Sequence, residues 1–330
     1  MKVTLCTVTV VVLALLTAPL AATAPPVGKV WRIGVLAGRQ AVGGAESPRG
    51  ASFRQGLRAL GYVEGQNIAF EWRSAEGQAE RFPELAAELV RLKVDVIVAT
   101  DNPAIAAAQH ATSTIPIVMV LAMDPVRTGF VDSLARPGGN LTGLTVQGTD
   151  IQGKLLQLLK DAVPTVSRVA VLWVPTEPGR HVQATEAEVA TRALGLEVHL
   201  LGVHSPAELD SLFTAMVHER VDAVLVHPSQ MFGPHQARIA ALAVQSRLPL
   251  IGLTRSWVED GALMSYGARD LDLFQRAASY VDRILRGTQA ADLPVEQPMT
   301  FRLILNLQTA KALGLTIPPS VLFQADEVIQ

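Results

Sequence analysis

The sequence is poor in cysteine, in aromatic residues and in net charge. Among its 330 residues 5% are aromatic, one is a cysteine, and 28 Lys and Arg nearly balance 30 Asp and Glu, which leaves a formal charge of -2. A protein that binds nucleic acid needs a clustered excess of Lys and Arg, so nucleic acid is not an expected partner. Because cores rarely grow past about 250–300 residues before dividing, we expect two domains.

Motifs for catalysis and metal binding are missing too. The seven histidines form no H-E-x-x-H pattern, and no acidic or cysteine partners stand at the spacing of metal ligands. No G-x-S-x-G nucleophile motif occurs in the sequence. We therefore expect no metal site, no cofactor and no enzymatic activity.

One segment nearly spells a P-loop. It reads GTDIQGKL at 148–155 and lies between a predicted strand and a predicted helix. Its last position is Leu155, which cannot ligate Mg²⁺ as Ser or Thr would. Thr149 and Gln152 instead have the spacing of a capping box, which starts a helix. We therefore predict a helix start here rather than a nucleotide site.

The first segment has the order of a secretory signal peptide. Lys2 is followed by an apolar run centred on residues 8–16 and then by small residues at 21–24. This order predicts a signal peptide over residues 1–24, with the exact cleavage position left open. A retained membrane anchor needs about 20 apolar residues and flanking charge, and the run is marginal on both counts. We expect a periplasmic mature chain that is not stably inserted in the membrane and that lacks Cys6, the single cysteine.

From residue 31 onward, short apolar runs alternate with helical patterns. Examples of such runs are WRIGVLA at 31–37, VDVIVA at 94–99 and PIVMVL at 116–121. Strands separated by helices predict parallel βαβ units. Because the runs are continuously apolar, the strands are expected to be covered on both faces of the sheet.

The same pattern returns after residue 166. Arg32 and the strand that follows it reappear at Arg168, an offset of 136, and Asp95 reappears as Asp222, an offset of 127. Two copies of one lobe with loop changes explain both offsets. The predicted fold class is α/β, with two doubly wound parallel-sheet lobes joined by a hinge of three crossings. Lobe I is expected to span residues 28–146 plus 267–294, and lobe II residues 147–266 plus 295–330.

Open parallel sheets bind ligands where the carboxyl ends of strands meet helix N-termini, because unpaired N–H groups are available there. Two facing lobes are expected to place two such edges across a cleft. The residues predicted to bind a ligand follow predicted strands and are polar or aromatic: Thr100, Asn102, Asp124, Trp173, Ser229, Thr254 and Trp257.

Two of these candidates have alternative structural roles. Asp124 can receive a ligand ammonium, or it can cap a following helix with Pro125 at the first helical position. Asn102, which also precedes a proline, has the same two interpretations.

The other candidates suit the two ends of a small organic ligand. Thr100 and Ser229 carry hydroxyl groups at strand ends, beside helix N-termini, where a carboxylate is well placed. Trp173 and Trp257 can stack on a flat ligand or contact an ammonium group. Trp173 can equally be a core residue at the lobe boundary.

Several ordered stretches resemble a known family. They include FRQGLRALGYVEGQNI (53–68), SLARPGGNLTGLT (133–145), LLKDAVPTVSRVAVLW (158–173) and NLQTAKALGLTIPPSVLFQADEVI (306–329). On these stretches the chain resembles the ABC-transporter substrate-binding proteins of the kind that includes tryptophan- and other aromatic amino-acid-binding members. The resemblance implies a type I periplasmic binding-protein fold, export, and delivery of a small-molecule solute to ABC permease and ATPase subunits.

Two loops depart from that family pattern. Asp101-Asn102-Pro103 stands where relatives commonly show a small residue with Pro, and Trp173-Val174-Pro175 stands where Asn-Pro is familiar. An aromatic amino acid is therefore not carried over as the ligand. The expected function is that of a monomeric, non-enzymatic solute-binding subunit of an ABC importer, which closes on an amino acid or a related carboxylate.

Two other classes of protein fit parts of the pattern. The same two-lobe fold serves as the effector domain of transcription regulators, but those carry an N-terminal helix-turn-helix where this chain has its apolar segment. A ligand-binding sensor subunit that docks on a membrane receptor stays open as an alternative, because the sequence does not reveal the docking partner.

Overall fold

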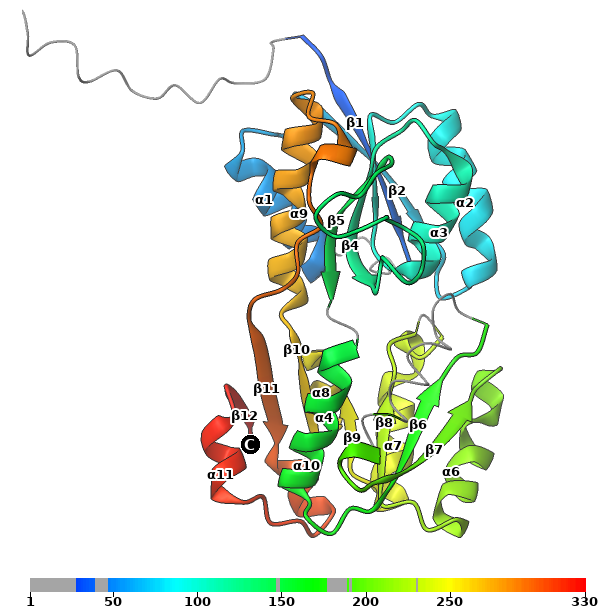
Figure 1. The fold of residues 1–330 in the computed structure, drawn as a ribbon, viewed down its shortest axis with the longest axis vertical. Coiled ribbons are helices and arrows are strands. Elements are labelled where there is room, and N and C mark those ends of the chain that lie inside the picture. The colour runs from blue at the N-terminus through cyan, green and yellow to red at the C-terminus, as the bar shows by residue number, and fades with distance from the viewer. Residues whose placement is uncertain (1–27, 39–46, 147–148, 177–188, 190–191, 230) are drawn as a thin grey trace, which may run out of the picture.

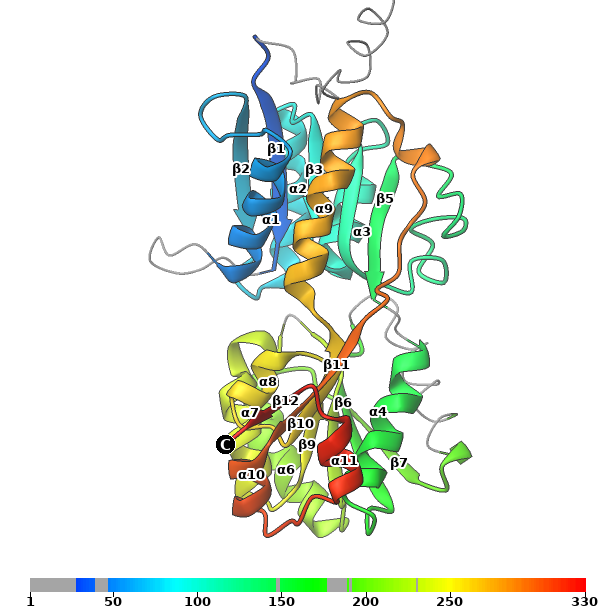
Figure 2. The same cartoon turned by 90° about the vertical axis from the view of Figure 1, so that its left-hand side faces the viewer.

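The structure, a computed structural model, describes residues 28–38, 47–146, 149–176, 189, 192–229 and 231–330. The predicted signal peptide at 1–24 lies outside the described residues. The chain forms two α/β lobes that lie end to end (Figures 1 and 2), which confirms the predicted fold class.

Lobe I is built on a five-stranded parallel sheet with the order β2-β1-β3-β4-β5. Its strands are β1 (Trp31–Ala37), β2 (Ile68–Ser74), β3 (Val96–Ala99), β4 (Ile117–Met123) and β5 (Leu141–Val146). Its helices are α1 (Pro48–Ala59), α2 (Phe82–Arg91), α3 (Asn102–Ala111) and α9 (Asp270–Leu285).

The strands of lobe I are buried on both faces. On β3, Val96 and Val98 pack with α1 and α9, whereas Ile97 and Ala99 pack with α2 and α3. All four residues are fully buried, and Figure 2 shows α1 and α9 side by side on their face of the sheet. Burial on two sides is the physical reason why the apolar runs show no alternation.

Lobe II is built on a seven-stranded sheet with the order β12-β11-β10-β9-β8-β6-β7. Its strands are β6 (Arg168–Trp173), β7 (Glu197–Gly202), β8 (Ala223–Val226), β9 (Leu250–Gly252), β10 (Met264–Ala268), β11 (Phe301–Asn306) and β12 (Glu327–Ile329). Its helices are α4 (Thr149–Ala162), α6 (Leu209–His218), α7 (Gln236–Gln245), α8 (Arg255–Glu259), α10 (Leu307–Ala312) and α11 (Pro319–Gln324). Single 3-10 turns lie at 79–81, 206–208, 233–235 and 290–292.

Three chain crossings orient the two sheets. Strand β5 of lobe I leads to α4 of lobe II, β10 of lobe II leads to α9 of lobe I, and the chain returns after residue 296 into β11. Strands β6, β8 and β9 run parallel to β10, and the other strands of lobe I run parallel to β5. The carboxyl ends of both sets therefore face the junction between the lobes. Because β11 starts at the junction, it runs antiparallel to β10.

The sequence repeat corresponds to a repeated polar contact at the edge of each sheet that faces away from the junction. In lobe I, Asp95 Oδ2 accepts the backbone N–H of Arg32 (2.7 Å), and the Arg32 side chain donates to the C-cap carbonyl of α2 (3.2 Å). In lobe II, Asp222 Oδ2 accepts the backbone N–H of Arg168 (2.8 Å), and the Arg168 side chain donates to the C-cap carbonyl of α6 (3.3 Å). Each contact ties a strand start to a helix end.

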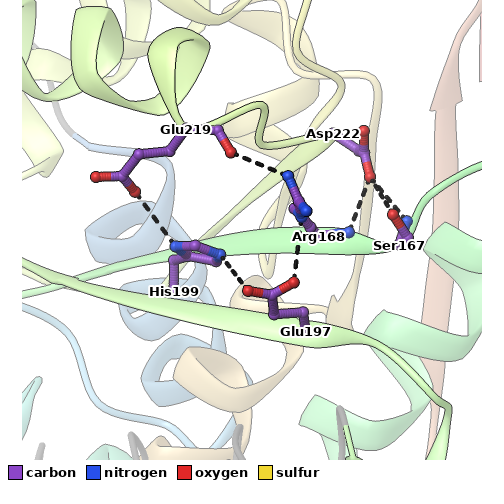
Figure 3. A network of polar contacts seen from close by, with 6 residues as sticks. All are labelled: Ser167, Arg168, Glu197, His199, Glu219 and Asp222. Carbon is purple, nitrogen blue, oxygen red and sulfur yellow. Dashed lines mark hydrogen bonds and ion pairs between the residues drawn. The ribbon is translucent and has the colours of Figure 1, made fainter.

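The contact in lobe II extends into a wider polar network (Figure 3). Arg168 Nε donates to Glu197 (3.1 Å), and the two ring nitrogens of His199 lie 3.2 Å from Glu197 and 3.2 Å from Glu219. The network joins β6, β7 and the end of α6 on the side of the sheet that faces away from the junction. It therefore stabilises the lobe and lies apart from the strand ends expected to bind a ligand.

Replacing Asp222 by asparagine is expected to destabilise the protein in a pH-dependent way. Burial alone would raise the pKa of Asp222, but hydrogen bonds from the backbone of Ser167 and Arg168 and from the Ser167 hydroxyl outweigh it and lower the pKa. A lowered pKa stabilises the fold above the unfolded-state value, which is near 4, and this stability is lost as the pH falls below it.

Because Asp222 is half-buried, we expect D222N to lose about 1 kcal/mol at pH 7 in urea unfolding and less at low pH. The exposed Asp292 is the matched control, since D292N should change stability by no more than about 0.5 kcal/mol. An equal loss for D222N at pH 7 and pH 3 would contradict the assignment.

Candidate functional site

The predicted ligand-binding residues come from the two strand edges that face the junction. Thr100, Asn102 and Asp124 follow β3 and β4 of lobe I. The lobe II residues end β6 or follow β8 and β9: Trp173, Ser229, Thr254 and Trp257. The topology therefore brings residues that are up to 157 positions apart in the sequence to the same two edges.

Thr100 organises the start of α3. Its backbone N–H donates to Leu36 of β1 (3.1 Å), and its hydroxyl donates to Asp101 Oδ2 (2.9 Å). Asp101 is the N-cap of α3, and its other carboxylate oxygen accepts the N–H of Ala104 (3.1 Å). Thr100 is buried, so its hydroxyl orients a capping carboxylate at the junction-facing edge.

Asn102 links the start of α3 to the end of β4. It is buried, its side-chain NH₂ donates to the carbonyl of Met123 (3.0 Å), and its side-chain oxygen accepts the N–H of Met123 (2.8 Å). Both hydrogen bonds join the start of α3 to the end of β4. The amide therefore holds the shape of the edge and is not the N-cap, a role that Asp101 takes.

Asp124 has a left-handed backbone, with φ of 47°. The residues after it form turns rather than the helix that Pro125 suggested. The side chain accepts the N–H of Arg127 (3.4 Å) and lies 3.6 Å from the Arg127 guanidinium. Aspartate tolerates this conformation better than most residues, and non-glycine residues at positive φ occur at functional sites as well as in turns.

The two tryptophans at the lobe II edge differ in their surroundings. Trp257 is 3% exposed and belongs to a buried apolar cluster, where its ring packs so closely on Gly252 that an added Cβ would lie 2.5 Å from it. Trp173 is half-buried at the end of β6, and it lies outside the apolar clusters formed by the described residues. Its indole nitrogen is buried near Gly202, at the end of the neighbouring β7.

Ser229 and Thr254 are half-buried hydroxyl residues of the lobe II edge. Ser229 Oγ accepts the N–H of Met231 (3.1 Å), and Thr254 Oγ1 lies 2.8 Å from the hydroxyl of Ser256. The adjacent Arg255 is directed away, because it donates to Glu327 (2.6 Å); this bond also raises the pKa of Arg255. The edge therefore presents neutral hydroxyl groups.

Sequence reasoning missed a buried polar pair beneath this edge. Gln152 and His227 are fully buried, and His227 Nε2 lies 3.0 Å from Gln152 Oε1. The amide oxygen of Gln152 contacts His227, whereas the Thr149 side chain of the predicted capping box lies outside the described residues. A signal was present in the sequence, because Gln152 shares the helical face of the apolar residues Leu155, Leu156 and Leu159.

The third crossing is anchored to lobe I at Glu296. Its backbone N–H donates to Gly143 of β5 (2.9 Å), and its carbonyl accepts the N–H of Thr145 (2.9 Å). Arg276 of α9 donates two hydrogen bonds to its carboxylate (2.9 and 2.8 Å), which lowers the pKa of Glu296. Between this anchor and the start of β11 at Phe301, the third crossing therefore consists of residues 297–300.

Two surface hollows formed by the described residues lie elsewhere. A surface hollow of about 810 Å³ lies between α4 and α11, and a second of about 300 Å³ lies at the amino ends of the lobe II strands, both away from the junction-facing edge. Within the described ranges no three His, Cys, Asp or Glu side chains gather as metal ligands. Over the same residues, no helix has both the length and the apolar character needed to cross a membrane.

Comparison with known proteins places the chain among solute-binding proteins. The sequence profile of the family described as ABC transporter substrate binding protein matches residues 47–329. A "Tyrosine-binding protein" of Clostridioides difficile (strain R20291) is 28% identical over 263 residues, which cover 80% of this chain and 75% of the relative.

Two solved structures extend the comparison. The ABC domain in complex with L-Trp from Streptococcus pneumonia has a TM-score of 0.84 at 26% identity, and the alignment covers 91% of this chain and 100% of that one. The ligand-free, open structure of a substrate binding protein with adhesive properties from Clostridium difficile has a TM-score of 0.64 at 25% identity, with the same coverage of both chains.

Proposed function

Because this chain belongs to the ABC transporter substrate-binding protein family, whose members bind solutes and are not enzymes, we propose that it is the solute-binding subunit of an ABC importer. It binds a small organic molecule between its lobes and delivers it to a membrane permease that works with an ATPase. The observation that carries the proposal is the orientation of the two sheets, whose carboxyl ends both face a junction that the chain crosses three times.

The proposed ligand is an amino acid or a related carboxylate. A relative is named for tyrosine binding and a similar structure holds L-Trp, which supports this class of solute. Asp124, at the lobe I edge, suits a ligand ammonium. Thr100, Ser229 and Thr254 offer hydroxyl groups, and Trp173 offers a flat indole surface. Asn102 and Trp257 complete the proposed set by shaping the two edges, because their side chains already pack within their own lobes.

Binding is proposed to close the lobes. Contacts from two edges form together only when the lobes approach, so the solute shifts an open-to-closed equilibrium, and the permease recognises the closed form. At nearly equal identity and equal coverage the TM-score is 0.84 against the L-Trp complex and 0.64 against the ligand-free, open relative. This difference supports two lobe arrangements within the family.

The site of action is proposed to be the periplasm, with the predicted signal peptide at 1–24 removed. The family to which the chain belongs works outside the inner membrane with transporter partners. The mature chain is proposed to act as a monomer, because one permease recognises one pair of closed lobes.

Thermal-shift screening of the purified mature protein against amino acids, aromatic acids and sugars tests the function. A solute at 100 times its Kd stabilises the folded state by about 2.7 kcal/mol, which raises the Tm by roughly 5 °C. We expect at least one amino acid to give such a shift and to be recovered unchanged after incubation. No shift with any amino acid or carboxylate would contradict the proposed ligand class, and conversion of the solute would contradict a binding function.

A further inference from the structure

The buried pair of Gln152 and His227 lies at the centre of the lobe II edge. His227 directly follows β8, and β8 is flanked in the sheet by β6 and β9, which carry Trp173 and Thr254 at their carboxyl ends. Gln152 lies in the first turn of α4, just after the first crossing between lobes. The pair therefore lies between the residues proposed to contact the solute.

The contact with His227 determines which way the Gln152 amide faces. The amide oxygen can only accept a hydrogen bond, so the His227 Nε2 atom 3.0 Å away must carry the proton and donate it. The amide NH₂ group is thereby turned away from His227.

The NH₂ group of Gln152 has no hydrogen-bond partner within the part of the chain that the structure describes, although Gln152 is fully buried. Burying a donor without an acceptor is costly, and such groups in native proteins call for an explanation. At the ligand-facing edge of a solute-binding lobe, a bound solute supplies an acceptor.

The surroundings select the kind of acceptor. Ile151 and Val226, next to the pair along the chain, are apolar and buried, and so is Leu155 one turn further along α4. A full negative charge is expensive to bury among such residues, and one neutral amide donor does not compensate it. A neutral oxygen, such as a phenol, alcohol or amide oxygen, needs no more than one such donor.

We propose that Gln152, oriented by His227, donates a hydrogen bond to a neutral oxygen on the side chain of the solute and so selects polar over apolar side chains. This inference rests on the proposed function and adds the part of the solute that lobe II recognises. The acidic and basic ends of an amino acid are left to the other edge residues.

Three pairs of similarly sized amino acids test the proposal by titration calorimetry: tyrosine and phenylalanine, threonine and valine, glutamine and methionine. In each pair the first member carries the neutral oxygen. For the pair that binds best, the wild-type protein is expected to prefer the first member by about tenfold. Gln152→Met should lower this preference to within about twofold, mainly by weakening the first member.

Gln152→Glu is the second variant, because it keeps an oxygen for His227 and removes the NH₂ donor. Loss of folding would weaken both members of a pair alike, so the affinity ratio separates recognition from stability. Gln157→Met is the matched control on the same helix, since Gln157 donates to Asp161 (2.7 Å) away from the edge, and it should keep the wild-type ratio.

The outcomes separate this inference from the proposed function. An unchanged ratio in both Gln152 variants, or no wild-type preference for the oxygen-bearing member of any pair, overturns the role of Gln152 alone. So does a wild-type protein that binds other amino acids but none of these six. A protein that binds no amino acid or carboxylate overturns the proposed function and this inference together.

Discussion

Gly143→Ala is expected to destabilise lobe I by about 3 kcal/mol or more, measured by urea unfolding. Gly143 lies in β5 with φ of 131°, a conformation that residues with a side chain rarely adopt. A Cβ atom there would lie 2.1 Å from the carbonyl oxygen and 2.7 Å from the nitrogen of Met119 in the neighbouring β4. Backbone atoms of a paired strand cannot move aside as a side chain can.

The same substitution should disturb the third crossing, because the Gly143 carbonyl accepts the backbone N–H of Glu296. Gly139→Ala is the matched control, since nothing lies within 4 Å of a Cβ at that position, and it should change stability by no more than about 0.5 kcal/mol. Wild-type unfolding of G143A would mean that β4 and β5 do not pair in this register.

The repeat could be recognised in the sequence because the repeated residues form hydrogen bonds with the backbone. Asp95 and Asp222 accept the N–H groups of Arg32 and Arg168 in equivalent corners, so a carboxylate and a strand start recur together. Lys93 and Arg220, two residues before each aspartate, both adopt positive φ, 52° and 57°, where the helix ends. The repeat therefore preserves a helix-ending conformation without glycine.

The candidate site could be predicted as a set of strand ends, but the direction of each side chain could not. Trp173 and Trp257 look alike in sequence, since both follow short apolar strands. Trp257 packs in the core against Gly252, which has no side chain to prevent the contact. This contact depends on the path of the loop between β9 and α8. Local patterns set the element boundaries, whereas side-chain contacts between distant elements arise only in the folded chain.

Gln152 illustrates the same limit in another way. Its spacing from Thr149 fits a local capping motif, yet its partner is His227, 75 residues further along. A buried polar side chain needs a partner, and the lobe II edge supplies one that the local sequence does not contain. Polar residues on the apolar face of a predicted helix are therefore better treated as candidates for long-range pairing than as caps.

Trp173→Ala is expected to weaken binding of the preferred amino acid by about 30-fold or more, measured by titration calorimetry. A buried tryptophan contact covers 150–250 Å² and commonly accounts for about 2–4 kcal/mol of binding free energy, so its loss is among the largest a single change produces. Trp173 is the tryptophan outside the apolar clusters of the described residues, whereas Trp31, Trp72 and Trp257 pack in or against them.

Trp31→Ala is the control that tests whether Trp173 contacts the solute. Trp31 opens β1, so it lies at the edge of lobe I that faces away from the junction, half-buried and with Lys29 3.5 Å from its ring centroid. Trp31→Ala can cost stability, but it should leave the affinity within about twofold of wild type. Trp173→Phe keeps a flat ring and should fall between the wild type and Trp173→Ala. Equal affinities for Trp173→Ala and Trp31→Ala would mean that the solute does not touch the end of β6, and the binding surface would then have to be sought on the lobe I edge around Asp124.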